Sequence, residues 1–166
     1  MENERTVKSW KSKGFLKPQE VELPPKQRIT RGPVAVIECP QEIPCDPCQA
    51  NCPAGAIDLE DINGTPTVDF EKCTGCSVCV ESCPGLAIFT VDCSSEKGCT
   101  VTIPYEFDLP EVGEEVIGLN RKGEEISRVT VTSLKTKGDS AFDTPTVTVQ
   151  VQEEHVNELR NIRRSK

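Results

Sequence analysis

Apolar residues in this chain occur in short runs, and their spacing predicts strands rather than long helices. Residues 34–37 form a continuous apolar run, and a second run ends at Val91. Residues 129–132 and 146–151 alternate apolar and polar positions with period two, which is typical of half-buried strands. Four or more short strands within residues 100–152 predict a small antiparallel barrel or curled sheet.

Turn residues and charged stretches separate these runs. Asn63–Gly64 predicts a tight turn between two short strands, and residues 120–123 and 137–139 predict two further turns. The first 31 residues are rich in lysine and are broken by Pro24–Pro25, so we expect a tail there. Such a tail either lies over the protein's own core or a partner, or is disordered.

These patterns predict an α+β fold in four parts. The 166 residues divide into an N-terminal tail (1–31), a cysteine-rich domain (32–99), a small β domain (100–152), and a C-terminal helix and tail (153–166). The helix is expected over residues 153–162, where the apolar spacing is helical. Aromatic residues make up only 4% of the chain, so no large hydrophobic core is expected.

Eight of the ten cysteines form two related runs. The second run, Cys73–Pro84, reads C-x2-C-x2-C-x3-C-P, which is the bacterial ferredoxin pattern. The first run, Cys39–Pro53, is a variant with a longer first spacing. A shift of 31 residues places Cys45, Cys48, Cys52, Pro53, Ala56 and Ile57 on Cys76, Cys79, Cys83, Pro84, Ala87 and Ile88. This repeat indicates a duplicated half-domain.

Eight thiolates are the number that two 4Fe–4S clusters require. In ferredoxins the last cysteine of each run binds the cluster of the other run. We therefore expect Cys39, Cys45, Cys48 and Cys83 to hold cluster 1, and Cys73, Cys76, Cys79 and Cys52 to hold cluster 2. The regular spacing would place Glu42 at the first ligand position, where we expect Cys39 after a three-residue loop expansion. A 3Fe–4S cluster, or ligation by Glu42, is the alternative.

The remaining candidate side chains indicate no catalytic site of the chain's own. Cys93 and Cys99 could form a redox disulfide or hold a further metal, but reduced thiols are the simpler expectation. Two cysteines cannot complete a zinc site. His155 is the only histidine, so a His-based catalytic triad is not expected, and no phosphate-binding glycine loop is present.

Charge and segment composition restrict the partners and the compartment. The net charge is −8, and residues 32–99 carry two Lys/Arg against eleven Asp/Glu. An acidic surface disfavours nucleic acid and can steer a basic redox partner. We expect neither a signal peptide nor a membrane span, hence a cytoplasmic protein whose reducing surroundings disfavour disulfides.

Several strings together resemble one known family. They are GPVAVIEC (32–39), IPCDPC (43–48), CTGC (73–76), CPGLAIF (83–89), IPYEF (103–107) and LRNI (159–162). They are similar to the small 4Fe–4S subunit of flavin-dependent amino-acid dehydrogenase complexes of the proline, hydroxyproline and sarcosine type.

The resemblance implies an electron-transfer iron–sulfur subunit without catalysis of its own. Flavoprotein subunits with FAD, in some complexes together with a 2Fe–2S subunit, would oxidise the substrate, and this chain would relay the electrons. A free-standing two-cluster ferredoxin is the alternative. A zinc-binding interaction module fits less well, because the second run supplies more closely spaced thiols than one tetrahedral zinc uses.

Overall fold

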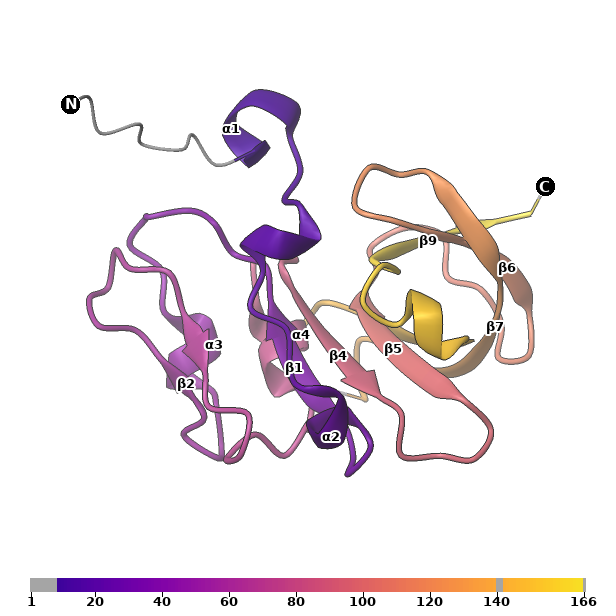
Figure 1. Cartoon of the computed structure of the whole chain (residues 1–166), viewed down its shortest axis with the longest axis horizontal. Coiled ribbons are helices and arrows are strands. Elements are labelled where there is room, and N and C mark those ends of the chain that lie inside the picture. The colour runs from indigo at the N-terminus through magenta and orange to yellow at the C-terminus, as the bar shows by residue number, and fades with distance from the viewer. Residues whose placement is uncertain (1–8, 140–141, 166) are drawn as a thin grey trace.

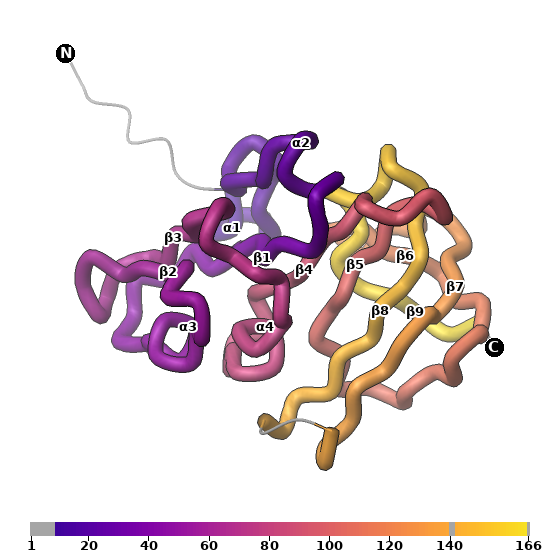
Figure 2. The backbone as a smooth tube through the Cα atoms, turned by 90° about the horizontal axis from the view of Figure 1, so that it is seen from below, coloured from indigo at the N-terminus to yellow at the C-terminus, as the bar shows by residue number. Residues whose placement is uncertain are grey.

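The computed structural model describes residues 9–139 and 142–165, which form one seven-stranded sheet, a two-stranded sheet and a few short helices. The strand order of the large sheet is β1-β4-β5-β8-β7-β6-β9, and every neighbouring pair is antiparallel. Figures 1 and 2 show α3 and the two-stranded sheet on one side of β1 and β4 and the remaining strands on the other, with α4 next to β1 and β4.

The cysteine-rich part has the repeated order that its sequence predicts. Its elements are β1 (Val34–Ile37), α3 (Pro47–Ala50), β2 (Ile57–Asp58), β3 (Thr67–Val68), α4 (Val78–Ser82) and β4 (Ile88–Asp92). The outer strands β1 and β4 pair with each other, and so do the inner strands β2 and β3. The predicted turn at Asn63–Gly64 connects the inner pair, which confirms that prediction.

The turn after each Cys-Pro dipeptide is the same in both repeats. The Gly55 amide donates to the Cys52 carbonyl at 3.2 Å, and the Leu86 amide donates to the Cys83 carbonyl at 3.2 Å. Both turn residues are left-handed, with φ of 57° at Gly55 and 52° at Leu86. Glycine adopts this conformation freely, whereas leucine does so at a cost of about 1 kcal/mol. The backbone of the duplicated loop is thus the same although its side chains differ.

Strands β1 and β4 are buried on both faces and belong to two hydrophobic cores. Val34, Val36 and Val91 point into the larger core, which they share with the strands that follow. Ala35 and Ile88 point the other way, into a smaller core with α3 and α4. Adjacent residues of a strand face opposite sides, so this pair of strands joins the two cores. Truncation of the fully buried Ile88 to alanine would cost about 2–5 kcal/mol.

The later strands form an open, bent sheet. Their bounds are β5 (Cys99–Pro104), β6 (Glu115–Leu119), β7 (Glu125–Lys135), β8 (Thr146–Val151) and β9 (Asn161–Arg164). Irregular register at Gly118/Leu119 and at Val131/Ser133 bends β6 and β7. Because β1 and β9 are the end strands in the described part of the chain, the curled sheet is correct and a closed barrel is not.

The connection between the two sheet halves corrects one expectation from the sequence. Cys93 and Cys99 form a disulfide across the β4–β5 connection, rather than remaining reduced thiols. Strands β4 and β5 pair from Thr90 to Asp92, so the large sheet is continuous across residue 99. The cysteine-rich part and the β part therefore share one sheet and one core.

The C-terminal segment also differs from its prediction. The expected helix over residues 153–162 is wrong: a single 3-10 turn, Glu153–His155, is followed by turns and then by β9. The apolar spacing instead buries Val156, Leu159 and Ile162 in the larger core. Pairing of β9 with β6 supplies the hydrogen bonds that a helix would have made internally. Lys166, part of the predicted basic end, lies outside the described residues.

The N-terminal segment lies over the protein's own core. It contains α1 (Ser9–Lys13), a 3-10 turn (Pro18–Glu20) and α2 (Lys26–Ile29), whereas residues 1–8 of the predicted tail lie outside the described part. Arg28 and Ile29 of α2 are buried. Figure 1 shows α1 projecting above the β1–β4 layer. Of the sequence alternatives for this segment, the structure shows the one that covers the chain's own core.

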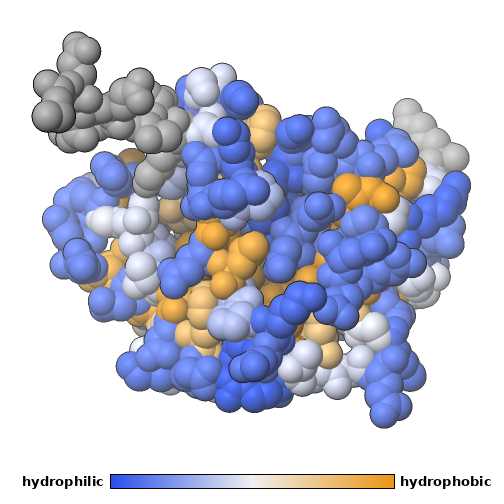
Figure 3. Space-filling view, viewed as in Figure 1, coloured by the Kyte–Doolittle hydropathy of each residue, from blue (hydrophilic) through white to orange (hydrophobic). Residues whose placement is uncertain are grey.

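The face shown in Figure 3 is mainly hydrophilic, with apolar patches between the charged side chains. Within residues 9–139 and 142–165, no helix has the length and apolar character needed to cross a bilayer.

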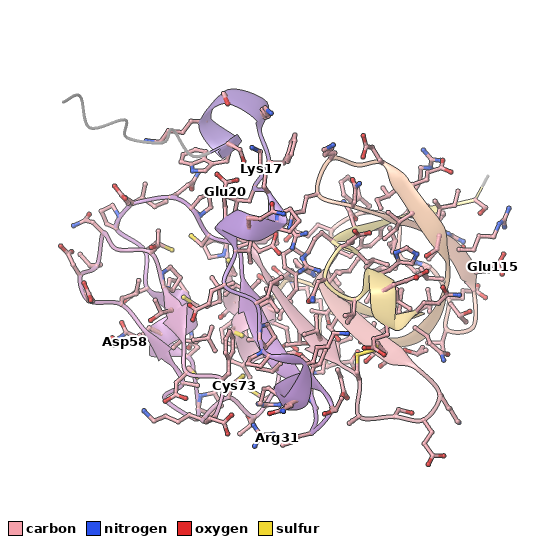
Figure 4. All side chains as sticks on the ribbon, viewed as in Figure 1. Lys17, Glu20, Arg31, Asp58, Cys73 and Glu115 are labelled. Carbon is pink, nitrogen blue, oxygen red and sulfur yellow. A yellow bond between two sulfur atoms is a disulfide. The ribbon has the colours of Figure 1, made fainter. Side chains whose placement is uncertain are left out.

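One carboxylate holds the α1 segment in place. Glu20 accepts hydrogen bonds from the Ser9 amide and the Lys17 amide, each at 2.7 Å, and from the Ser9 hydroxyl. Figure 4 shows Glu20 next to Lys17. The Ser9 hydroxyl, followed by the two amides, lowers the pKa of Glu20 from 4.5 to about 2. A carboxylate with a lowered pKa stabilises the folded state. For Glu20 this stabilisation is complete above pH 4.5 and is lost as the pH falls towards 2.

We predict that Glu20→Ala releases residues 9–17 while the rest of the fold remains intact. At pH 7, amide hydrogen exchange of this segment should accelerate at least about threefold, because three hydrogen bonds to a charged acceptor are lost. Hydrogen-exchange mass spectrometry measures the rate, and Glu22→Ala is the matched control on an exposed neighbour. Equal exchange in the two variants would contradict the anchoring role.

Candidate metal centre

Four cysteines surround a first hollow next to β1. Cys39 follows β1, Cys45 precedes α3, Cys48 lies within α3, and Cys83 follows α4; all four line the same hollow. The residues therefore come from both repeats, with three from the first and one from the second. This is the grouping expected for cluster 1.

Four other cysteines surround a second hollow next to α4. Cys52 follows α3, Cys73 and Cys76 lie in the loop before α4, and Cys79 lies within α4. Here three residues come from the second repeat and one from the first. Figure 4 shows Cys73 on the same side of the molecule as Arg31, which follows α2.

The structure places Cys39, and not Glu42, at the first hollow. Cys39 lines the hollow together with its neighbours Gln41 and Ile43, whereas the Glu42 side chain does not line it. Glu42 is an exposed residue of the same loop. The three-residue expansion of the first run thus places a thiol where regular spacing would have placed a carboxylate.

Burial makes the thiolate form of the deepest cysteines unfavourable without a bound cation. Cys48 and Cys79 are only 8% and 7% exposed. Desolvation raises the pKa of Cys48 to about 11 and that of Cys79 to about 12, with the nearby thiols as a further cause. Desolvation, followed by Cys83 and Cys39, also raises the pKa of Cys45. Iron fits these groups because a thiolate-bound metal offsets the burial of negative charge.

Backbone amides donate hydrogen bonds to three of the sulfur atoms. The Ala56 amide donates to Cys52 Sγ at 3.3 Å, and the Ala87 amide donates to Cys83 Sγ at 3.5 Å. These two bonds occupy equivalent positions in the repeat. The Ala35 amide of β1 donates to Cys73 Sγ at 3.4 Å. Such bonds stabilise negative charge on sulfur and tune the reduction potential of iron–sulfur clusters.

The cysteine groups differ from a site for one metal ion. Among the described residues, no three His, Cys, Asp or Glu side chains are gathered around a single ion position. A 4Fe–4S cluster does not require several side chains to converge on one ion position, because each of its four irons takes a separate thiolate.

Arg28 holds the loop that carries Cys73, and no sequence pattern indicated this role. Its guanidinium donates to the carbonyls of Phe70 and Cys73 at 2.6 Å each. It also donates to the carbonyls of Gly32 at 2.9 Å and Pro33 at 3.1 Å. A single buried side chain therefore fixes both the start of β1 and the start of the second cysteine run. In the sequence, Arg28 was one of several basic residues in a segment expected to be a tail.

Gly75 allows the same two segments to approach closely. Its φ is 69°, and a Cβ there would lie 2.3 Å from the Pro33 carbonyl oxygen. No side chain fits at that distance, so the C-x2-C loop requires glycine at this position.

Comparison with known proteins identifies the second cysteine run. The sequence model of a family described as the 4Fe-4S binding domain matches residues 66–89. Pyruvate synthase subunit PorD of Methanocaldococcus jannaschii is 43% identical over 49 residues, covering 30% of this chain and 56% of that protein. Ferredoxin-type protein NapF of Haemophilus influenzae is 47% identical over 49 residues, covering 28% of each chain.

A third relative belongs to another complex. One subunit of the ion-translocating oxidoreductase complex of Methanosarcina acetivorans is 46% identical over 46 residues, covering 28% of this chain and 17% of that protein. The chain spans little more than half the length, or less, of these curated relatives. No solved structure matches the chain. The matched part is of the 4Fe–4S ferredoxin type, and a 4Fe–4S cluster is the cofactor that these similarities support.

We predict that Gly75→Ala destabilises the protein by about 2–4 kcal/mol, because the new methyl group collides with Pro33, just before β1. Thermal unfolding and iron retention after gel filtration measure the effect. Gly55→Ala is the control: its Cβ meets nothing within 4 Å, and Leu86 already places a side chain at the equivalent left-handed position. If Gly75→Ala retained as much iron and stability as Gly55→Ala, the close approach would not matter.

We predict that Arg28→Lys accelerates the release of iron, because an ammonium group cannot reach four carbonyls in the planar arrangement of a guanidinium. The loss of hydrogen bonds should destabilise the folded protein by roughly 2–4 kcal/mol. Bleaching of the visible absorbance in the presence of a chelator gives the rate. Arg31→Lys, an exposed neighbour that pairs with Glu71, should bleach at the wild-type rate. Equal bleaching rates for Arg28→Lys and Arg31→Lys would contradict the positioning role of Arg28.

Proposed function

We propose that the chain carries two 4Fe–4S clusters and transfers electrons as a subunit of an oxidoreductase complex. Cluster 1 is held by Cys39, Cys45, Cys48 and Cys83, and cluster 2 by Cys52, Cys73, Cys76 and Cys79. The single observation that carries this proposal is the division of eight free cysteines into two groups of four around separate hollows. The clusters would supply one-electron oxidation and reduction.

The crossed grouping would keep the two clusters close to each other, because each helix region carries ligands of both. Helix α3 and the residues after it contribute Cys48 to one group and Cys52 to the other, and α4 likewise leads from Cys79 to Cys83. The two helices also contact each other. Any movement of one helix therefore affects both sites, so the chain maintains a fixed separation between two electron carriers.

The surface near cluster 1 supports a docking role for the cysteine-rich part. Ile43 and Ile62 are 48% and 55% exposed on neighbouring loops, linked by a hydrogen bond of 3.1 Å from the Cys45 amide to the Ile62 carbonyl. The acidic residues Glu42, Asp46, Glu60 and Asp61 are exposed on the same loops. Exposed apolar side chains among acidic ones suit a partner with a basic rim around an apolar centre.

The nature of the partner rests on the resemblance and on the relatives. PorD and the relative from the ion-translocating complex are named as subunits of larger oxidoreductases, which favours a complex for this chain as well. Among such complexes we propose a flavin-dependent amino-acid dehydrogenase, whose FAD lies in a partner subunit. In this scheme residues 32–99 carry the electrons. Residues 100–152 extend the sheet and support the cluster-1 side through Arg121.

We predict about eight iron and eight acid-labile sulfide per chain in anaerobically purified protein, because two cubes contain that number. Cys39→Ala should lose iron from one site only, leaving about seven or fewer per chain, whereas Glu42→Gln should retain all eight. Chemical iron and sulfide assays give the count, and electron paramagnetic resonance of the reduced protein separates the two clusters. If Glu42→Gln lost iron while Cys39→Ala retained it, Glu42 rather than Cys39 would be the ligand of cluster 1. Protein that contained zinc and no sulfide would contradict the proposed electron-transfer function.

Purification of the tagged chain from its native host tests the partner separately. Co-elution with a yellow, FAD-containing protein that oxidises an amino acid supports the dehydrogenase complex. A brown monomer without partners points to the free-standing ferredoxin instead. Co-elution with a flavin-free oxidoreductase retains the electron-transfer role and rejects the amino-acid dehydrogenase.

A further inference from the structure

A cleft of about 490 Å³ adjoins the hollow that the four cysteines surround, and Cys39, Cys45 and Cys83 line both. Its lining includes Cys39, Cys45 and Cys83, and also three aromatic residues, Trp10, Phe15 and Phe89, which we call the aromatic wall. Clefts of about 300–1,000 Å³ with apolar walls and few polar groups are typical of sites for small molecules. The N-terminal segment, which the sequence predicted to be a tail, contributes Trp10 and Phe15 to the lining of the cleft.

Two buried hydrogen-bond donors on residues of this cleft have no partner among the described residues. They are Trp10 Nε1 and Arg160 Nη2. The Arg160 side chain is 4% exposed, and its other nitrogens are used: Nε donates to Glu38 at 2.6 Å, and Nη1 donates to the carbonyls of Val156 and Leu159. A buried donor without an acceptor costs about 1–3 kcal/mol. Both donors belong to residues that line the cleft, and a ligand with acceptor oxygens could satisfy them once these side chains turn towards it.

The charges around the cleft favour a neutral acceptor over a carboxylate. Glu38 accepts from Arg121 at 2.6 and 2.9 Å and from Arg160, so one buried carboxylate already balances one of the two guanidinium groups. The cysteines in the lining, once bound to a cluster, would add negative charge. A ligand with a full negative charge would be repelled by that charge, whereas a polarised carbonyl oxygen could accept from Arg160 without this repulsion.

We propose that this cleft binds a flat, neutral redox-active ring with carbonyl oxygens, the chemical class to which quinones and flavin rings belong. The aromatic wall accommodates the face of the ring, and the indole and guanidinium donors take its oxygens. The ring would lie next to three cysteines of cluster 1, close enough to exchange electrons with that cluster. The inference rests on the proposed function, which assigns a cluster to those cysteines and with it the negative charge that favours a neutral ligand.

The sole tryptophan of the chain makes a site-specific test available. We would label Trp10 as 5-fluorotryptophan and follow its single fluorine NMR signal in the full, iron-loaded protein while isothermal calorimetry gives the affinity. The probes are 2,3-dimethyl-1,4-naphthoquinone, which cannot add to thiols at its blocked ring positions, and riboflavin. The matched charged probe is 2-naphthoate. We expect at least one neutral ring to shift the signal and to bind about tenfold or more tightly than 2-naphthoate.

The two neutral probes distinguish the source of the ring. Binding of the quinone alone assigns a quinone, and binding of riboflavin alone assigns a flavin ring. Tighter binding of 2-naphthoate than of both neutral rings would overturn the proposal in favour of an anion site. An unmoved fluorine signal with all three probes would overturn it outright.

Variants test the two donors separately. Trp10→Phe retains an aromatic ring and removes only the Nε1 donor, so calorimetry should show about threefold to tenfold weaker binding. Arg160→Lys should weaken binding about tenfold, and Arg163→Lys, an exposed arginine paired with Glu125, is its control. If Arg160→Lys does not fold, Phe15→Ala tests the half-buried wall instead. Unchanged affinity in Trp10→Phe and in the second variant would contradict the assigned donors.

Iron content measured on the same samples separates this proposal from the proposed function. Ring binding to a chain that lacks iron would retain the cleft and reject the electron-transfer role. A chain that contains eight iron atoms and binds none of the probes would keep the electron-transfer role and reject the ligand proposed for the cleft.

Discussion

The two-faced strand pair β1–β4 is the feature on which the rest of this molecule depends. Every position of β1 points either towards the cysteine-bearing helices or towards the strands β5–β9, and both faces are buried. Because side chains alternate along a strand, a one-residue slip of this pair would exchange the two cores and displace Cys39. The register Val34↔Val91 and Val36↔Phe89 therefore controls the geometry of the metal centre as well as the sheet.

Much of the cysteine-rich part could be predicted because its repeat is local in sequence. The 31-residue shift aligned the Cys-Pro turns, and the structure gives them the same hydrogen bonds and the same left-handed residue at Gly55 and Leu86. The crossed grouping of cysteines was likewise expected from the ferredoxin pattern. In such segments the turn chemistry and the metal ligands come from residues a few positions apart, which a single sequence shows directly.

Two of the features that were missed depend on contacts far apart in sequence. Residues 153–162 have helical spacing, yet Leu159 and Ile162 are buried because β9 pairs with β6, more than 40 residues earlier. The Cys93–Cys99 disulfide is local, with a sequence separation of 6, and it was not favoured because a reducing compartment was expected. The hairpin pairing of β4 and β5 brings these two residues together. Arg28 resembled any basic residue of a tail, since two of its four carbonyl partners, Phe70 and Cys73, lie 42 and 45 residues away.

The buried cluster of Glu38, Arg121 and Arg160 explains why a β extension is attached to the cysteine-rich part. Glu38 stands immediately before Cys39, while Arg121 comes from the β6–β7 turn and Arg160 from the segment before β9. Removal of one partner from such a buried group costs about 3–5 kcal/mol, because the remaining charge stays desolvated. The cluster therefore couples the β extension to the backbone that carries Cys39. It also retains one guanidinium nitrogen that has no acceptor within residues 9–139 and 142–165, although apolar side chains could have filled the same volume at less cost. Stability alone does not account for that choice, whereas the ligand proposed for the adjoining cleft would.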